Sequence, residues 1–313
     1  MVFAIYESLF PSTVLEFFQV GDPGYVASLQ ILGILDGLFA IGYIYAALRL
    51  DKAFPFIAIG LWVKVIIPCA WLLAVVGGYV PLRTLPLVLF DGVVWWIPFA
   101  SFLLEGSAVG ALLRSLAPYA CALLNLIAAG ALALVLRPGS EVVPDAASRI
   151  AYITNNEVLW RAGWVCWIAA ALSLLAFYAW WAARLPSWVD DEGAPPWGVI
   201  ALAIASIGLV FDLTAESLLI GWLPKDFATV APMASVLTGG IGNGLYTIAG
   251  ALLTFLTRGL NSWLLVWTWV IWVVGFELSA FTFVGDFLGV AVCSGLLFTL
   301  FCPWVVVMGR KLA

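Results

Sequence analysis

Repeated long apolar runs constrain this chain more than any other feature. A helix needs about 20 apolar residues to cross the hydrocarbon core of a bilayer. Nine runs of this kind lie between prolines, glycines and charged residues, at 28–49, 54–79, 85–104, 112–136, 157–183, 197–222, 229–256, 262–283 and 287–308. We therefore expect nine transmembrane helices. Eight is the nearest alternative, because only "VGDF" separates the last two runs.

The composition agrees with a membrane protein. Of the 313 residues, 65% are hydrophobic and 10% are charged, and the mean hydropathy is +1.12. A soluble domain is roughly 45–50% apolar and about 25% charged. Membrane lipid must therefore be a partner, and we predict an all-α, polytopic integral membrane helix bundle in the bacterial cytoplasmic (inner) membrane. A basic surface for nucleic acid is not expected.

The polar segment 137–157 divides the expected helices into four and five. Its Pro, Gly, Ser and acidic residues are typical of a connector outside the membrane. We therefore predict two parts. Residues 1–137 form an interfacial segment with four helices, and residues 138–313 form the connector with five. Lys and Arg are more frequent in the loops that become cytoplasmic if the amino terminus lies outside. This orientation places the carboxyl terminus in the cytoplasm.

The residue types present limit the chemistry of the chain. It contains no histidine, which excludes His-ligated haem and the usual zinc and di-iron sites. Five cysteines lie far apart in apolar runs with no CxxC spacing, and we interpret them as small buried hydrophobic residues. We expect no cofactor and no metal site.

Three ionisable residues lie inside consecutive runs of the first half: Asp36, Lys64 and Asp91. A charge at the bilayer centre costs about 2.5–3.5 kcal/mol, so each one requires a partner or a wet cavity. One base between two acids is a plausible buried cluster. It either fixes helix packing or forms a ligand or proton site.

The second half contains a richer polar set. Asp212 and Glu216 lie four residues apart in "GLVFDLTAESLLIGWLP", so a helix places both on one face. Arg161, itself four residues after Glu157, is the cation that could offset Glu216. The predicted ligand- or ion-binding residues are Arg161, Asp212, Glu216, Asn243, Tyr246 and Glu277. Because acids outnumber Arg161, we expect at least one to be protonated, either for proton or cation exchange or as a neutral hydrogen-bonded acid.

Two further patterns leave alternatives open. In "TGGIGNGLYT" (238–247), Gly240 and Gly244 form a GxxxG motif. Such a motif indicates close helix contact, but four glycines in six residues could instead unwind the helix and expose carbonyl groups. Trp95 and Trp96 lie deep in the third run and either pack or form one wall of a site for an apolar ligand.

Three functions fit these features. The leading hypothesis is the binding or transport of a small hydrophobic or cationic molecule, or of an ion, with proton coupling as a variant. The second is an accessory or structural subunit of a larger membrane complex or of a homo-oligomer. The third is an enzyme of lipid or isoprenoid metabolism that uses carboxylates for acid–base chemistry, although no residue can be assigned as catalytic.

Overall fold

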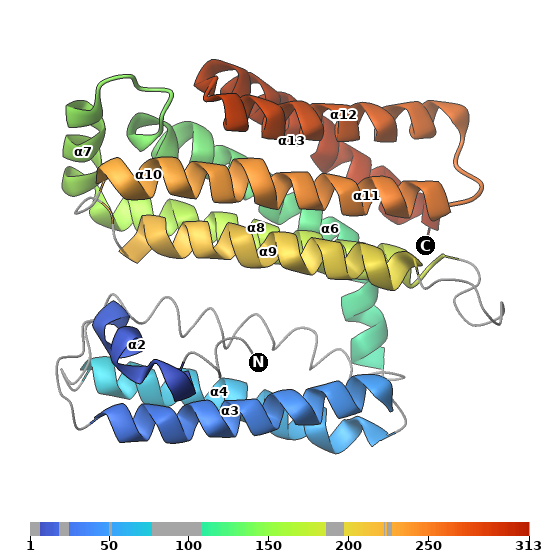
Figure 1. Cartoon of the computed structure of the whole chain (residues 1–313). Helices are drawn as coiled ribbons and strands as arrows, with labels where there is room; N and C mark the ends of the chain where they lie inside the picture. Colours follow the sequence, from blue (N-terminus) through green and yellow to red (C-terminus); the bar gives the residue numbers. More distant parts are fainter. Residues whose placement is uncertain are drawn as a thin grey trace. The chain divides into compact units, whose positions relative to one another are not determined.

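The computed structural model describes residues 7–18, 25–49, 52–76, 108–185, 197–221, 223 and 227–312 (Figure 1). The chain forms two compact units, Met1–Ala111 and Leu112–Ala313. The described residues contain helices and no strand. Each unit is considered by itself below.

Three helices are described in the first unit: α2 (Pro11–Phe18), α3 (Tyr25–Leu48) and α4 (Phe54–Val76). Helices α3 and α4 correspond to the first two expected spans. They contact each other through the rings of Tyr45 and Phe56, whose centroids lie 5.5 Å apart. The third expected span, 85–104, lies outside the described residues.

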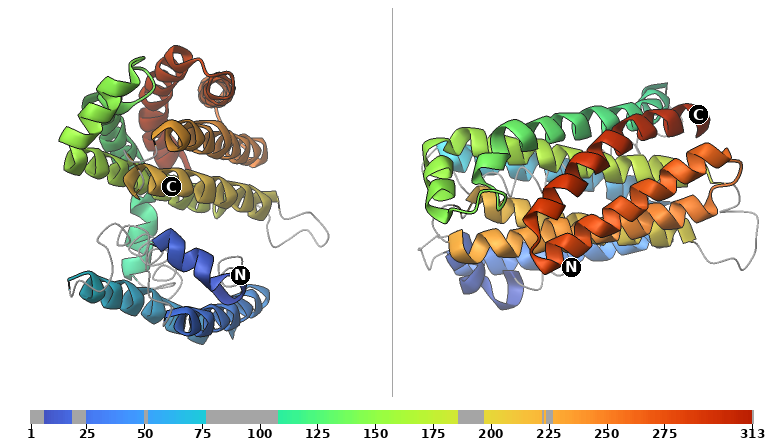
Figure 2. Two further views of the ribbon diagram at one scale, coloured as in Figure 1. Left: turned by 60° about the vertical axis from the view of Figure 1, so that its left-hand side comes forward. Right: turned by 90° about the horizontal axis from the view of Figure 1, so that it is seen from above.

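The second unit contains the remaining described elements (Figure 2). In chain order these are α6 (Ala108–Ala131), the π-helix η3 (Leu132–Leu136), the 3₁₀ turn η4 (Arg137–Gly139), α7 (Ala146–Asn155), α8 (Glu157–Ala182), α9 (Trp197–Gly221), α10 (Phe227–Ser235), the π-helix η5 (Val236–Gly242), α11 (Asn243–Leu256), α12 (Ser262–Val284) and α13 (Phe287–Leu312). Helices α10, η5 and α11 follow one another without a break. Together they form the expected span 229–256.

Seven helices in the described part of the chain are long and apolar enough to cross a membrane. They are Leu29–Leu48, Arg114–Gly139, Glu157–Ala182, Trp197–Gly221, Phe227–Leu256, Ser262–Val284 and Phe287–Leu312. Within α4, the stretch Phe54–Pro68 is a shorter apolar helix. The described chain is thus an all-helical bundle of the kind found in multi-pass membrane proteins, and the full number of nine spans stays a prediction.

The turn between α12 and α13 shows why two spans follow each other so closely. Gly285 ends α12 in the left-handed conformation, with φ at 74°, which a residue without Cβ adopts at little cost. The carboxylate of Asp286 then accepts a hydrogen bond of 3.0 Å from the backbone N–H of Gly289 in the first turn of α13. These two residues turn the "VGDF" sequence into a reversal between separate helices.

Helix α6 begins within the first unit, but the rest of it packs in the second. The amide of Asn125 donates a hydrogen bond of 3.4 Å to the hydroxyl of Ser173 on α8. Further along the chain, a Cβ added to Gly309 of α13 would lie 2.7 Å from Cβ of Pro118. The boundary between the compact units therefore precedes the 137/138 division that the polar connector suggested.

The connector between the fourth and fifth expected spans carries a short capped helix. At the start of α7, the carboxylate of Asp145 accepts hydrogen bonds from the side chain and the backbone N–H of Ser148. These bonds lower the pKa of Asp145. Tyr152 on α7 donates a hydrogen bond of 2.7 Å to the carbonyl of Val135. The connector is thus fixed to the end of the membrane helix before it.

An aromatic core fastens α8, α11, α12 and α13 together. The ring of Trp304 lies 5.5–5.8 Å from the rings of Trp181, Trp272 and Phe177. Each of three indole N–H groups donates a 2.8 Å hydrogen bond to a threonine hydroxyl; the pairs are Trp181–Thr257, Trp272–Thr254 and Trp304–Thr268. The core therefore satisfies its polar atoms between helices, as a lipid environment requires.

Replacing Trp304 by alanine should lower the free energy of unfolding by about 3 kcal/mol. This is the lower end of the range for buried Trp→Ala changes, because lipid supplies no hydrophobic driving force between helices and only packing and the hydrogen bond are lost. Denaturation of the purified protein in micelles measures the change. The matched control is Trp263→Ala, since Trp263 is 54% exposed. Equal losses in both variants would contradict the role of this core.

Candidate functional site

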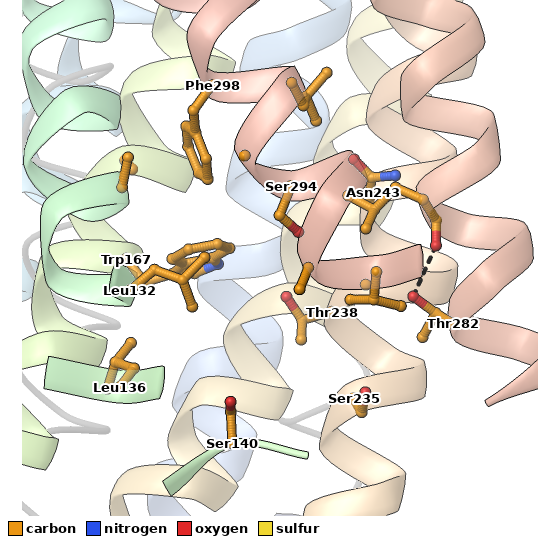
Figure 3. A pocket seen from close by; sticks show the side chains of 18 of the residues that line it. Leu132, Leu136, Ser140, Trp167, Ser235, Thr238, Asn243, Thr282, Ser294 and Phe298 are labelled. Carbon is orange, nitrogen blue, oxygen red and sulfur yellow. Dashed lines mark hydrogen bonds between the residues drawn. The ribbon is translucent and has the colours of Figure 1, made fainter. Parts of the chain in front are cut away.

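A cavity of about 690 Å³ lies within the second unit (Figure 3). Its volume falls in the range of small-molecule sites, roughly 300–1,000 Å³. Most of its wall is apolar. The polar and charged lining residues are Asn125, Arg137, Ser140, Glu141, Asp212, Ser235, Thr238, Asn243, Tyr246, Thr247, Thr282 and Ser294.

Both π-helical segments contribute to this cavity. Segment η3 supplies Leu132 and Leu136, and η5 supplies Thr238 and Gly239. Figure 3 shows the leucines on one side of the cavity and Thr238 on the other. Wide turns of this type are rare in helices and occur frequently at functional sites.

The glycines of η5 and α11 allow close helix contact. A Cβ added to Gly240 would lie 3.1 Å from the ring of Phe283, and one added to Gly244 would lie 3.3 Å from Oγ of Ser279. Both contacts are with α12. The segment keeps its helical form as a π-helix, so the close-packing interpretation of the GxxxG motif is confirmed and the unwound alternative is wrong.

A second glycine contact brings η5 against α9. A Cβ on Gly208 would lie 3.1 Å from the carbonyl oxygen of Gly242. One helical turn further along both elements, Asp212 of α9 meets Thr238 of η5. The two elements run antiparallel. Because the glycines let the two backbones approach closely, the side chains of Asp212 and Thr238 one turn away come within hydrogen-bonding distance.

Asp212 is the central ionisable residue of the cavity wall and is only 3% exposed. Its Oδ1 accepts a hydrogen bond from the hydroxyl of Thr238, and its Oδ2 accepts a longer one, 3.3 Å, from the hydroxyl of Tyr246. The indole N–H of Trp167 also interacts with this carboxyl group. These neutral donors hold it in place, and no described Lys or Arg forms an ion pair with it.

Glu216 lies one turn from Asp212 and is fully buried. Neither of its carboxyl oxygens has a hydrogen-bond partner. The expected partner, Arg161, instead donates a 2.5 Å hydrogen bond to Glu157, four residues before it on α8. The pair Glu157–Arg161 is as the sequence indicated, but the structure does not show the expected compensation of Glu216 by Arg161.

The other predicted residues separate into two groups. Asn243 and Tyr246 line the cavity with Asp212, and Asn243 donates hydrogen bonds of 2.7 Å to the carbonyl of Gly275 and 2.9 Å to the hydroxyl of Ser279. Glu277 is exposed on the surface of α12 and does not line the cavity. Arg161 does not line it either.

The first polar cluster cannot be assembled from the described residues, because Asp91 lies outside them. Asp36 and Lys64 are half-buried, and both have interaction partners. Trp95 and Trp96 also lie outside the described part. The cluster of Asp36, Lys64 and Asp91 therefore stays a prediction.

Three tryptophans of α8 form a wall that the sequence analysis overlooked. The rings of Trp160, Trp164 and Trp167 follow one another at centroid distances of 5.5 and 6.1 Å, and the last ring contacts Phe298 of α13 at 5.6 Å. All four residues line the cavity. The spacing of three and four residues along one predicted helix places such side chains on a common face and would have identified them.

The indole N–H groups of this wall differ in their partners. Trp160 donates a 3.1 Å hydrogen bond to the carbonyl of Leu219. The buried Nε1 atom of Trp164 has no acceptor, and the indole N–H of Trp167 interacts with the carboxyl group of Asp212. One hydrogen-bond donor of this wall, that of Trp164, is therefore available to an occupant of the cavity.

One end of the cavity carries opposite charges. It is lined by Arg137 on η4, in the last turn of the span Arg114–Gly139, and by Glu141 in the loop that follows. Burial raises the pKa of Glu141, and the nearby Arg149 opposes this shift. Arg137 is exposed, so its charge remains close to water.

Metal ligands do not gather anywhere in the described ranges. No group of three or more Cys, Asp or Glu side chains there is placed to hold a metal ion. Four of the five cysteines, Cys121, Cys166, Cys293 and Cys302, are described and are free thiols. The carboxyl groups in the cavity wall are those of Asp212 and Glu141.

The chain matches no protein-family model, and searches of the curated proteins and of the solved structures find no match.

The two buried acids should respond oppositely to apolar replacement. Glu216→Met should raise the free energy of unfolding by about 1–3 kcal/mol, because it removes buried polar atoms that have no partner. Asp212→Leu should lower it by a similar amount, since the hydroxyls of Thr238 and Tyr246 lose their acceptor. Thermal or chemical denaturation in micelles measures both. Destabilisation of equal size in the two variants would show that Glu216 has a partner in the folded protein.

Proposed function

We propose that this multi-pass membrane protein binds a small molecule or ion in the cavity beside Asp212 and transports it or senses it. The observation that carries the proposal is the buried carboxyl group of Asp212 in the wall of a cavity of about 690 Å³. Ionisable residues inside membrane spans are expensive and generally mark substrate or ion pathways. Here the residue also faces space that a ligand can fill.

The pair of acids supports coupling to protons. Asp212 and Glu216 lie one turn apart on α9, and no described cation forms an ion pair with either. A negative charge in an apolar interior is strongly unfavourable unless it is paired. Each carboxyl group therefore requires a proton or a bound cation, and exchange of one for the other would couple ligand binding to proton movement.

Catalysis is a weaker interpretation of the same cavity. The chain has no histidine, and no cysteine lines the cavity. The hydroxyl closest to an acid, that of Thr238, donates its proton to a carboxyl group that holds the helix contact in place. A nucleophile activated by an adjacent base requires a different arrangement, so binding or transport is favoured.

The proposed setting is the bacterial cytoplasmic membrane, with nine spans and the amino terminus outside. The loop distribution of Lys and Arg supports this orientation. So do the basic residues Arg310 and Lys311 in the last turn of α13. Under this proposal, Arg137 and Glu141 lie at the outer end of the cavity.

Blocking the cavity should abolish the binding of Nile red, an uncharged amphiphilic dye. Gly295 lines the cavity, and a Cβ added there meets no atom within 4 Å. Gly295→Trp should therefore fold, fill the space with an indole and weaken saturable binding at least about tenfold. Dye fluorescence in lipid nanodiscs, corrected for empty nanodiscs, measures the affinity.

The matched control is Gly130→Trp on α6. A Cβ at Gly130 also meets no atom within 4 Å, but this residue does not line the cavity. The control should bind Nile red like the wild type. If the wild type shows no saturable binding, or if both variants bind equally well, the cavity is not a small-molecule site and the proposed function is wrong.

The orientation can be tested with single cysteines in a variant whose five native cysteines are replaced. Ala147 on α7 and Lys311 at the end of α13 are both exposed. A membrane-impermeant maleimide should label Ala147→Cys in intact cells and Lys311→Cys only after lysis, because an odd number of spans separates them. Labelling of both from outside would require an even number, and the opposite pattern would reverse the orientation.

A further inference from the structure

The cavity opens sideways between α6 and α13. The two helices are in contact where Pro118 meets Gly309, at a distance that leaves no space for a side chain on the glycine. Towards the cavity they diverge, and Figure 2 shows α13 crossing the other helices obliquely. The lining residues there are Leu126 on α6 and Leu288 and Val292 on α13, which are 61%, 72% and 61% exposed.

These exposed leucine and valine side chains lie within two membrane-spanning helices. In a bilayer they face hydrocarbon chains, so the opening leads from lipid to the interior of the unit. An apolar molecule dissolved in the membrane can reach the cavity without passing through water. A small inorganic ion cannot use this path, because its transfer into hydrocarbon is prohibitive.

The interior end of the cavity is negative. Among the described lining residues the ionisable carboxyl and guanidinium groups are Arg137, Glu141 and Asp212. Arg137 is exposed in the last turn of the span Arg114–Gly139, and Glu141 follows that span. Of the three, only Asp212 lies within the middle of a span, with Glu216 buried one turn away. A cationic group on the occupant would satisfy this carboxylate.

The aromatic wall favours the same kind of occupant. Trp164 and Trp167 line the cavity, and Trp167 interacts with Asp212. Figure 3 shows the indole of Trp167 directed into the space shared with Thr238 and Ser294. Indole faces attract ammonium groups by cation–π interaction. A neutral ligand would gain no ionic attraction from the carboxylate, and an anionic ligand would be repelled by it.

We propose that the occupant is a lipophilic organic cation that enters from the bilayer between α6 and α13 and places its ammonium group between Asp212 and the indole of Trp167. The apolar body of this molecule lies against the leucines of η3 and α13. The inference rests on the proposed function and names its ligand class. An occupant of this class would account for a cavity wall that is apolar apart from a few polar groups around Asp212.

Three probes that share one apolar body separate the charge classes: 4-phenylbutylamine, 4-phenylbutan-1-ol and 4-phenylbutanoate. Calorimetry with the full-length protein in nanodiscs, corrected for partition into empty nanodiscs, gives the three affinities. The amine should bind at least about tenfold more tightly than the alcohol, since both can donate a hydrogen bond to the carboxylate but only the ammonium adds ionic attraction. The carboxylate should bind least tightly.

Asp212→Asn should remove the preference for the amine while keeping a hydrogen-bond acceptor for Thr238. The matched control is Glu277→Gln, because Glu277 is a membrane-span acid that does not line the cavity. This control should keep the wild-type preference. If Asp212→Asn fails to fold, the comparison of the three probes on the wild type still decides the ligand class.

The proposal is overturned if the alcohol or the carboxylate binds as tightly as the amine, or if Asp212→Asn retains the preference. Binding of Nile red that Gly295→Trp abolishes would then still support a small-molecule cavity, so only the ligand class would be wrong. If the wild type shows no saturable binding of Nile red, the proposed function itself is wrong.

Discussion

The close packing of α9 against η5 is the contact on which the site depends. Gly208 and Gly242 let the two backbones approach, because a Cβ on Gly208 would lie 3.1 Å from the opposing carbonyl oxygen. Antiparallel helices in register repeat their contacts at each turn, so Asp212 meets Thr238 one turn away. In a membrane, small residues at helix interfaces and interhelical hydrogen bonds provide much of the association energy. Here both occur side by side, and the result is a carboxyl group held firmly at a cavity wall.

Most buried polar atoms of the second unit are paired, and this makes the exceptions informative. Threonine hydroxyls accept the indole N–H groups of Trp181, Trp272 and Trp304 across helix boundaries. By contrast, the buried Nε1 atom of Trp164 has no acceptor, and Trp164 lines the cavity. Lipid cannot supply hydrogen bonds to such a group, but a ligand with a suitable polar atom can. The Nε1 atoms of Trp180 and Trp267 are also unpaired, but neither residue lines the cavity.

The sequence predicted the spans better than it predicted which side chains meet. Spans such as 262–283 follow from the length of apolar runs, which the bilayer thickness determines, and the structure places α12 at Ser262–Val284. The sequence does not show which side chains of a span point into the bundle, because all faces of an apolar helix have similar hydrophobicity. Glu277 therefore looked equivalent to Asp212, although it points outward. Arg161 forms its ion pair with Glu157, four residues before it on the same helix. This pair requires no tertiary contact, whereas a pair with Glu216 would. The π-helices have no sequence pattern that separates them from glycine-rich α-helix.

The division of roles between the two acids follows from their positions. Asp212 lines the cavity and can contact an occupant, whereas Glu216 is fully buried beside it and does not line the space. A second carboxyl group one turn away acts on a bound cation through its field, which a low-dielectric interior screens weakly. Under the proposed function, Glu216 would therefore strengthen binding of a cation without touching it, and it would offer a proton site when the cation leaves. A buried acid with no hydrogen-bond partner lowers the stability of the fold. Its electrostatic effect on the neighbouring carboxyl group is consequently the physical role that the geometry of α9 leaves for Glu216.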